Sequence, residues 1–274
     1  MISIIIPANN EEAYIGACLG ALLAQKTDRA AEVIVAANAC TDATSKIVLD
    51  YHARFSEKGW VLQLLYIEKP GKPNALNRAD TAASGAERIY LDADVIMGPL
   101  LFEKISLELE LHRPVYVSGQ LQLTPRKSWV TRAYGRIWAK LPFMTHGVSG
   151  AGLFAVNAAG RARWDVFPKI ISDDTYVRLS FAPQERILVD ASYQWPLVEG
   201  FSALVRVRRR QNRGVQEVHK LYPRLVRNAG EPRLTLGKMG RLALADPFGF
   251  LVYLGVLGAA KFPNRAGKGW SRGR

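Results

Sequence analysis

Two aspartates, Asp92 and Asp94, are separated by one alanine and follow directly after a short apolar segment at residues 88–91. The apolar segment is typical of a buried strand, where a charged group is costly unless a partner compensates for it. Two carboxylates at this spacing suit a divalent cation, Mn²⁺ or Mg²⁺, that bridges a diphosphate, because such ions prefer hard oxygen ligands. The alternative is that both residues only cap the next segment, since acidic residues are common in turns.

The elements that must position this pair alternate between strand and helix patterns. β-branched and apolar runs indicate strands, and apolar residues at helical spacing indicate helices. The predicted strands cover residues 2–6, 32–37, 60–67 and 88–91, and the predicted helices cover residues 11–25, 43–55 and 74–86, with Thr41 or Asp42 as the N-cap of the second helix. This alternation predicts an α/β fold with a largely parallel sheet covered on both faces.

Polar clusters follow the carboxyl ends of these four strands. They are PANNEE, NACTD, EKPGK and DAD, at residues 7–12, 38–42, 68–72 and 92–94. In open parallel sheets, ligands bind outside the carboxyl ends of the strands. We therefore expect the four clusters to converge on one crevice.

The later part of the chain adds further predicted elements. A helix is expected from residue 100 to about 112, a strand at 115–123, a helix at 128–141, and a glycine-rich turn before a short strand that ends at 156. Acidic and basic clusters, SDD at 172–174 and RRRQNRG at 208–214, come after these elements.

Seven motifs in a fixed order carry a resemblance to a known family. They are NNEE (9–12), NACTD (38–42), GKPNALN (71–77), DAD (92–94), SGAG (149–152), SDD (172–174) and RQNR (210–213). On this ordered set the chain resembles the family 2 glycosyltransferases from Met1 to about Gly214. The resemblance implies the GT-A fold, a Rossmann-like three-layer sandwich, together with an inverting mechanism, a nucleotide-sugar donor and a divalent metal.

The resemblance assigns a nucleoside pocket to Pro7, Asn10, Glu12 and Asn38. Family members usually have an aspartate pair and a serine in the stretch that here reads AANACTD, so this chain departs from the pattern. Asn38 still offers a carbonyl acceptor for the imide N–H of a nucleobase. Its alternative role is to cap the following helix.

Basic residues are expected around the diphosphate. Lys72 follows Gly71 in a loop just before a helix, where its ammonium could reach the nucleotide, although exposed loop lysines are common. RRRQNRG resembles the family motif [QR]-x-x-R-W, with Arg210 and Arg213 at its polar positions and Gly214 in place of tryptophan. Guanidinium groups there would stabilise the leaving diphosphate, and loss of the tryptophan favours a single transfer over polymer synthesis.

The second acidic cluster contains Asp173 and Asp174, about 80 residues after the first. The family pattern has Glu-Asp at this place, and its Asp is the base that deprotonates the acceptor hydroxyl during direct displacement. Asp174 aligns with that base and Asp173 with the glutamate. The two carboxylates also suit the first turn of a helix at TYVRLSF, where the helix dipole favours them. The helix does not exclude catalysis.

Composition excludes several classes of protein. The chain has 274 residues, of which 49% are hydrophobic and 22% are charged, so it is neither fibrous nor disordered. Cys18 and Cys40 lie in no CxxC or His-rich context, so a disulfide framework or zinc site is not expected and a reducing cytosol fits. The opening MISIIIPANN lacks the basic region of a secretory signal and is better interpreted as a core strand.

Positive charge is concentrated at the C-terminal end. Residues 205–274 contain 16 Lys and Arg against 3 Asp and Glu, whereas the two signs balance in the rest of the chain. The uncharged run at 247–260 is shorter than the roughly 20 residues of a spanning helix. Basic residues and a tryptophan flank it: Lys238, Arg241, Lys261, Arg265, Lys268, Trp270 and Arg272.

Two interpretations of this tail stay open. It suits an interfacial segment on an anionic cytoplasmic leaflet, where a lipid-linked acceptor would lie within reach. It equally suits a helix packed on the body. We expect a GT-A domain at 1–214, with a nucleotide-sugar half at 1–98 and an acceptor half at 99–214, followed by a basic helical tail at 215–274.

The partners expected for the leading hypothesis are a nucleotide-sugar donor and a hydroxyl acceptor, such as a lipid-linked or bacterial cell-surface glycan precursor. A nucleotidyltransferase is a second hypothesis. Enzymes of that class have a Gly-rich GxGxR loop after the first strand, whereas PANNEE has no glycine. A third is a non-catalytic protein that binds nucleic acid through the basic tail; it predicts salt-sensitive affinity for any duplex. For the leading hypothesis, no nucleic acid is expected.

Overall fold

A computed structural model of the chain describes residues 1–124, 127–230 and 234–262. The strands are β1 (Ile2–Ala8), β2 (Ala31–Asn38), β3 (Val61–Ile67), β4 (Glu87–Leu91), β5 (Ile96–Met97), β6 (Tyr116–Thr124), β7 (Leu153–Val156) and β8 (Arg186–Pro196). The α-helices are α1 (Ile15–Leu23), α2 (Thr44–Asp50), α3 (His52–Glu57), α4 (Lys72–Ala82), α5 (Leu101–Leu109), α6 (Trp129–Trp138), α7 (Pro142–Thr145), α8 (Ala158–Arg161), α9 (Asp173–Leu179), α10 (Phe201–Leu221), α11 (Leu236–Ala245) and α12 (Pro247–Lys261). Two 3₁₀ helices, η1 (Pro183–Glu185) and η2 (Pro223–Asn228), complete the described elements.

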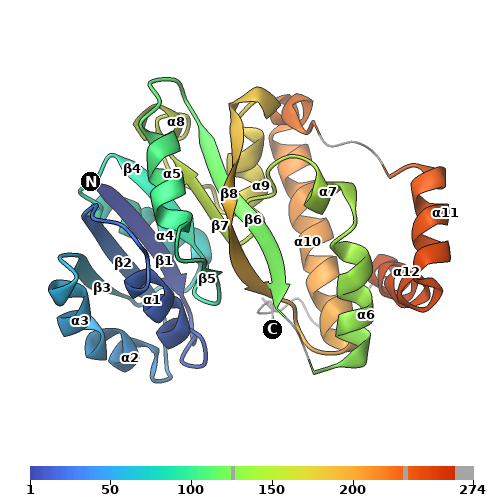
Figure 1. The fold of residues 1–274 in the computed structure, drawn as a ribbon, viewed down its shortest axis with the longest axis horizontal. Coiled ribbons are helices and arrows are strands. Elements are labelled where there is room, and N and C mark those ends of the chain that lie inside the picture. The colour runs from blue at the N-terminus through green and yellow to red at the C-terminus, as the bar shows by residue number, and fades with distance from the viewer. Residues whose placement is uncertain (125–126, 231–233, 263–274) are drawn as a thin grey trace.

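The strands of the described residues form one sheet in the order β3-β2-β1-β4-β7-β6-β8-β5 (Figure 1). Strands β1 to β4 run parallel to one another, and β8 runs parallel to β6. β7 runs antiparallel to both β4 and β6, and β5 antiparallel to β8. Because the four parallel strands end at the same edge, the loops that follow them meet there.

Helices cover both faces of this sheet. Side chains alternate between faces along a strand, so Ile4 and Ile6 of β1 pack with α1, α2, α3 and α5 on one face. Ile5 packs on the other face with α4, and the same cluster contains Val177 of α9. The three-layer α/β architecture that the sequence predicts is therefore confirmed.

The predicted elements of the first half are confirmed with small shifts in their bounds. The helix expected at 43–55 is two helices, α2 and α3, which meet at Tyr51. Its N-cap is Ala43, one residue after the predicted Asp42, although the Asp42 carboxylate accepts a hydrogen bond from the Thr44 N–H at 3.0 Å. Helix α4 begins at Lys72 rather than at residue 74, because Pro73 suits the first turn of a helix.

Strand β8 is the largest element that the sequence pattern did not indicate. It has 11 residues and pairs with β6 over most of its length, with a register shift between Ser118 and Gln120. Its side chains are mostly half-buried or exposed, so it lacks the apolar run that marks the other strands. The antiparallel β7 and the edge strand β5 complete the second half of the sheet.

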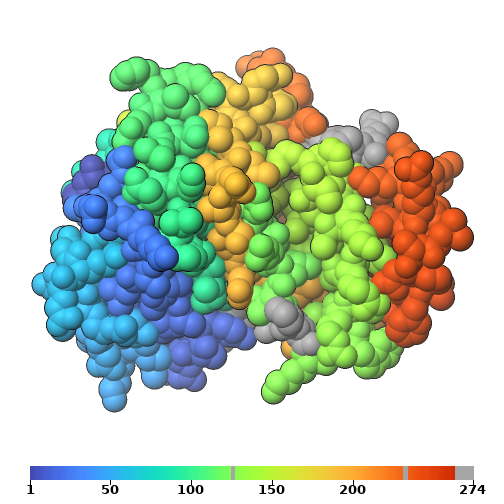
Figure 2. Space-filling view, in the orientation of Figure 1, coloured from blue at the N-terminus to red at the C-terminus, as the bar shows by residue number. Residues whose placement is uncertain are grey.

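A separate helical layer packs against the end of the sheet. Helices α6, α10, α11 and α12 share a core that includes Tyr134, Leu204, Leu242 and Tyr253. Helix α10 is continuous across residue 214, the predicted boundary of the tail. Figure 2 shows α11 and α12 at the outer edge of the molecule, beside α6. Within the described residues, no helix combines the length and the apolar character that a membrane crossing requires.

Candidate active site

Five of the predicted site residues line one pocket at the carboxyl ends of β1 and β4. These residues are Pro7, Lys72, Asp92, Asp173 and Asp174. A larger open groove of about 500 Å³ lies beside Tyr176 and Tyr222, but none of the predicted site residues lines it. We place the candidate site at the smaller pocket because its titratable groups converge there.

Lys72 connects the two acidic clusters. Its ammonium lies 2.9 Å from Asp92 Oδ1 and 3.2 Å from Asp173 Oδ2. Burial alone would lower the pKa of Lys72, but the carboxylates of Asp173, Asp92 and Asp174 raise it above its ordinary value. The lysine is therefore a fixed positive charge between carboxylates that are 81 positions apart in the chain.

Asp92 and Asp94 follow the end of β4 and are both half-buried, while Ala93 and Val95 are buried. The thiol of Cys18 lies near both carboxylates: burial raises its pKa, and the charges of Asp94 and Asp92 raise it further. The segment is a turn in which the Val95 N–H donates to the Asp92 carbonyl at 3.1 Å, and Asp92 lines the pocket whereas Asp94 lies just outside its wall. Among the described residues, no group of three or more His, Cys, Asp or Glu is arranged to hold a metal.

Asp173 and Asp174 form the first turn of α9, as the sequence predicts. Asp173 is 4% exposed, and burial raises its pKa to about 6, with Lys72 opposing the shift and Asp174 adding to it. Asp174 is half-buried, and its Oδ1 accepts hydrogen bonds from Ser172 Oγ at 2.9 Å and from Thr175 N at 2.7 Å. Both bonds end on the same oxygen, so they fix the orientation of the carboxylate without using Oδ2.

The residues predicted to line the nucleoside pocket hold two loops together. Asn10 has a positive φ of 55°, and its Oδ1 accepts a hydrogen bond from the Thr41 N–H at 2.7 Å. Glu12 Oε2 accepts one from the Ala43 N–H at 3.0 Å. These bonds join the loops after β1 and β2, and contact of Asn10 and Glu12 with a nucleoside stays a prediction.

Asn38 is buried and positions the loop before α4. Its Nδ2 donates to the Lys69 carbonyl at 2.8 Å, and its Oδ1 accepts from the Gly71 N–H at 2.7 Å. Gly71 has a φ of 138°, which favours glycine. Asn38 therefore sets the start of α4, where Lys72 lies, and its contact with a nucleobase stays a prediction.

The surroundings of Gly152 explain why the SGAG motif ends in a residue without a side chain. Its carbonyl accepts a hydrogen bond from the Asp92 N–H at 2.8 Å, and its φ is 74°. A Cβ at this position would lie 2.7 Å from the Trp195 ring and 2.9 Å from Val95. A larger residue would therefore displace the segment that carries Asp92.

Arg210 and Arg213 lie on α10, outside the wall of the pocket. One helix position further, a Cβ at Gly214 would lie 2.9 Å from Ser172 Cβ and 3.0 Å from Ile171. Helix α10 therefore packs directly on the residue that precedes Asp173. This close approach gives a physical reason for glycine where the family motif has tryptophan.

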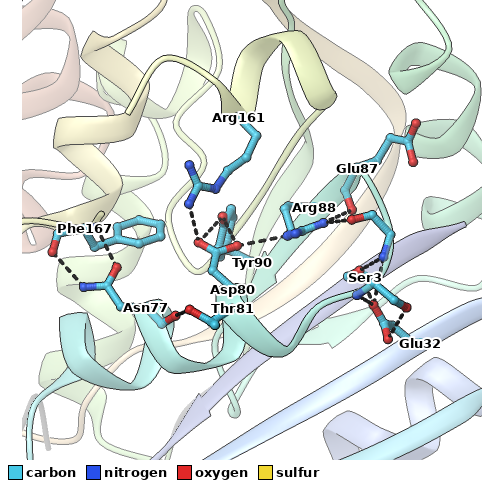
Figure 3. Close-up of polar contacts among 12 residues, drawn as sticks. Ser3, Glu32, Asn77, Asp80, Thr81, Glu87, Arg88, Tyr90, Arg161 and Phe167 are labelled. Carbon is cyan, nitrogen blue, oxygen red and sulfur yellow. Dashed lines mark hydrogen bonds and ion pairs between the residues drawn. The ribbon is translucent and has the colours of Figure 1, made fainter. Parts of the chain in front are cut away.

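A buried ionic network, which sequence reasoning missed, holds α4 against β4 (Figure 3). The Asp80 carboxylate pairs with Arg88 Nε at 2.9 Å and with Arg161 Nη2 at 3.2 Å, and it accepts the Tyr90 hydroxyl at 2.9 Å. Because Lys72 begins α4 and Asp92 follows β4, this network sets the distance between them. The separations of Asp80, Arg88 and Arg161 along the sequence do not predict that their side chains meet.

Two further sets of hydrogen bonds in Figure 3 fix the same helix. Asn77 Oδ1 accepts from the Phe167 N–H at 2.7 Å, and Asn77 Nδ2 donates to the Phe167 carbonyl at 3.0 Å. At the other end of α4, Glu32 accepts the Ser84 N–H at 2.6 Å and the hydroxyl of Ser3. Asn77, the last residue of the GKPNALN motif, therefore ties α4 to the segment at Phe167.

A sequence profile described as "Glycosyl transferase family 2" matches residues 3–162, more than half of the chain. No curated protein matches the chain in sequence. Among solved structures, the mannosyltransferase PcManGT from Pyrobaculum calidifontis in complex with GDP-Man and Mn²⁺ is similar, with a TM-score of 0.59 and 20% identity over 94% of this chain and 74% of that one.

S. aureus TarS is also similar in fold. The 1–349 fragment in complex with UDP has a TM-score of 0.53 and 16% identity over 76% of this chain. The match spans 63% of that fragment and 38% of a longer TarS structure. These likenesses support the GT-A fold, and the sequence profile supplies the family. The chain therefore belongs to glycosyl transferase family 2.

Proposed function

We propose that this chain transfers a sugar from a nucleotide-sugar donor to a hydroxyl acceptor with inversion, and that it uses a divalent metal at Asp92 and Asp94 and Asp174 as the base. One observation carries the proposal. The carboxylates of Asp92, Asp173 and Asp174 meet around Lys72 in a single pocket at the carboxyl ends of the parallel strands. This arrangement supports a cation site and a proton acceptor side by side.

The residues present fit a metal ion. The Lys72 ammonium against Asp92 Oδ1 shows that this carboxylate is accessible to a positive charge. Mn²⁺ and Mg²⁺ can be held by one or two carboxylates when substrate phosphates supply the other ligands. Asp92 and Asp94 would hold the ion, which when bound supplies charge neutralisation for the diphosphate. PcManGT was solved with GDP-Man and Mn²⁺, which supports the same pairing of metal and nucleotide sugar here.

The donor would lie across the loops after β1, β2 and β3. Pro7, Asn10, Glu12 and Asn38 would face its nucleoside end, by the resemblance to the family. Lys72 would move from the carboxylates to the diphosphate, where its charge opposes that of the leaving group.

Arg210 and Arg213 would add positive charge near the diphosphate from α10. Gly214, on the same helix, is packed against Ser172, so α10 reaches the segment that carries the base. A change of side-chain rotamer could bring the guanidinium of Arg210, one helical turn before Gly214, toward the pocket.

Asp174 would take the proton from the acceptor hydroxyl. As the acceptor oxygen bonds to the anomeric carbon, the bond between that carbon and the diphosphate oxygen breaks, and the nucleoside diphosphate leaves from the opposite side. The hydrogen bonds from Ser172 and Thr175 to Oδ1 orient this carboxylate. Asp173, which pairs with Lys72, would keep the lysine in place until the donor arrives.

The acceptor hydroxyl would belong to a lipid-linked or cell-surface glycan precursor, and the protein would act at the cytoplasmic face of a membrane. The support for this is the charge distribution. The chain has an excess of positive charge that lies entirely beyond residue 204, next to an uncharged run. Anionic lipid surfaces attract such segments.

Calorimetric titration with UDP, GDP and dTDP, each with and without Mn²⁺, tests the proposed donor and metal together. We expect one of the three nucleotides to bind, with an affinity that Mn²⁺ increases. Absence of binding by all three, or affinities that do not change with Mn²⁺, would contradict the proposal. A panel of nucleotide sugars, assayed for hydrolysis, would then identify the sugar.

A further inference from the structure

Six exposed apolar side chains form a surface on the outer helices of the C-terminal region. This outer apolar surface consists of Trp129 from α6, Leu236 and Leu244 from α11, and Phe248, Leu251 and Leu254 from α12. Leu236 and Leu244 are 85% exposed, and Leu251 is 67% exposed. The rings of Trp129 and Phe248 are 5.4 Å apart between centroids, so the exposed side chains of α6 and α12 meet there, and α11 packs beside α12.

Helix α12 has two apolar faces, of which the described residues cover only one. Tyr253 and Val256 are buried against α6 and α10, in the core of the helical layer. Phe248, Leu251 and Leu254 lie on the opposite side of the helix and are exposed. A helix at the surface of a globular protein normally places charged and polar residues on this side. Within residues 1–124, 127–230 and 234–262, nothing covers the outer side of α12, although its apolar composition favours a partner there.

The charge around this surface is positive. In the described part of the chain after residue 233, Lys238, Arg241 and Lys261 are basic, and Asp246 is the one acidic residue. Asp246 is already held by Arg136, whose Nε lies 2.7 Å from its carboxylate. The tail residues Arg265, Lys268, Trp270 and Arg272, which the sequence also places near this run, lie outside the described residues.

We propose that the outer apolar surface docks on the interface of a bilayer that contains anionic lipids. The apolar side chains would enter the region of the lipid headgroups, and the basic residues around them would face the lipid charge. A second copy of the chain is a poorer occupant, because a symmetric contact would bring the same basic residues against one another. Helix α12 has 15 residues and would lie in the plane of the interface rather than cross it.

This surface is connected to the candidate active site through α10. Arg209 Nη2 on α10 donates a hydrogen bond to the Ala259 carbonyl of α12 at 2.7 Å. Five residues further along α10, Gly214 packs on Ser172, next to the proposed base. Docking would therefore hold α10, the helix that packs on the segment of the proposed base, close to the membrane surface. Only the consequence that the acceptor is carried by a lipid rests on the proposed function.

Co-sedimentation of the full chain with vesicles tests the docking surface. The vesicles contain either phosphatidylcholine alone or phosphatidylcholine with about one third phosphatidylglycerol. We expect the wild type to sediment with the anionic vesicles, less so with neutral vesicles and less at high salt. The double variant Leu244→Glu, Leu251→Glu should bind the anionic vesicles at least about tenfold more weakly, because each leucine contributes about a tenfold factor when it is buried.

The matched control is the double variant Leu49→Glu, Leu107→Glu, which changes two leucines that are 53% and 47% exposed on α2 and α5. It should sediment with the vesicles as the wild type does. Equal binding by both double variants, or no binding of the wild type to either vesicle, would overturn the proposal. A wild-type dimer in light scattering that Leu244→Glu, Leu251→Glu dissociates would assign the surface to a second copy instead.

Nucleotide binding in vesicle-free buffer separates this inference from the proposed function. Leu244 and Leu251 lie outside the wall of the pocket, so the double variant should bind nucleotide with Mn²⁺ as the wild type does. Vesicle binding without any nucleotide binding would leave the docking surface in place and remove the proposed function. Nucleotide binding without vesicle binding would keep the proposed function and overturn the docking surface.

Discussion

The two acidic clusters of the pocket differ in setting, although the same lysine contacts both. Asp92 follows a strand, its side chain is 34% exposed, and the Lys72 ammonium lies against it. Asp173 is in the first turn of a helix, its side chain is 6% exposed, and its pKa is raised to about 6. A partly exposed carboxylate suits a metal that arrives with its substrate, whereas the helix N-terminus suits carboxylates that handle a proton.

This difference gives a physical reason to assign separate functions to the clusters. A metal ligand must stay ionised and accessible, and a base must be held in one orientation. Asp174 meets the second requirement through the two hydrogen bonds to its Oδ1. Variants that affect one cluster and spare the other can therefore sharpen the comparison or break it.

The largest effect is expected for Asp174→Asn. Loss of the base should lower turnover of the nucleotide sugar by about 10²- to 10⁴-fold, the usual contribution of general base catalysis. The measurement is the rate of nucleoside diphosphate release at saturating donor. Asp165→Asn, a change at an exposed aspartate outside the pocket, is the control and should keep the wild-type rate. Normal turnover by Asp174→Asn would remove the distinction between the clusters.

Asp80→Asn tests the scaffold that both clusters share. It leaves Arg88 and Arg161 buried without their ionic partner, which should cost about 3–5 kcal/mol of unfolding free energy. Urea unfolding followed by circular dichroism measures this change. Glu110→Gln, which removes an exposed partner of Arg29, should cost less than about 1 kcal/mol. Equal costs for the two variants would show that the network does not position α4.

The pKa of Asp173 predicts a dependence of stability on pH. The folded chain binds this proton more tightly than the unfolded chain, because the pKa rises from 3.8 to about 6. The stabilisation from Asp173 is therefore present below about pH 4 and is lost as the pH rises to about 6, by up to about 3 kcal/mol. The wild type should lose this amount relative to Asp173→Asn in urea unfolding across that range. Parallel stability curves would contradict the raised pKa.

A smaller effect is expected for Lys72→Met. Removing the ammonium from Asp92 should tighten binding of Mn²⁺ alone by about tenfold and weaken binding of the nucleoside diphosphate, because the lysine competes with the ion and attracts the phosphate. Calorimetry with each ligand separately measures both effects. The control is Lys69→Met, which changes an exposed lysine in the loop just before α4. Unchanged Mn²⁺ affinity would mean that Lys72 does not compete with the ion.

Much of the fold could be predicted from the sequence because local patterns carry it. The runs at β1, β2 and β4 are apolar on both faces, as buried parallel strands require, and polar residues follow each of them. β8 could not be predicted in this way, because its side chains are partly exposed and its pairing with β6 is a long-range property. The break between α2 and α3 at Tyr51 likewise has no local signal.

Five residues that line the pocket could be named from the sequence, but the contacts among them could not. Strand ends indicated Asp92, and the family pattern indicated Asp173 and Asp174. The bridge through Lys72 and the network around Asp80 depend on which residues the fold brings together, and single-sequence patterns do not contain this information. Family motifs also indicated Asn38, but its buried amide holds the loop before α4.

Titration of nucleoside diphosphate into Asp92→Ala and Asp174→Asn, each with and without Mn²⁺, tests the separation of functions most directly. The account predicts that Asp92→Ala loses the increase in affinity that Mn²⁺ gives, whereas Asp174→Asn binds as the wild type does under both conditions. Identical behaviour of the two variants, whether both lose or both keep the Mn²⁺ effect, would contradict it.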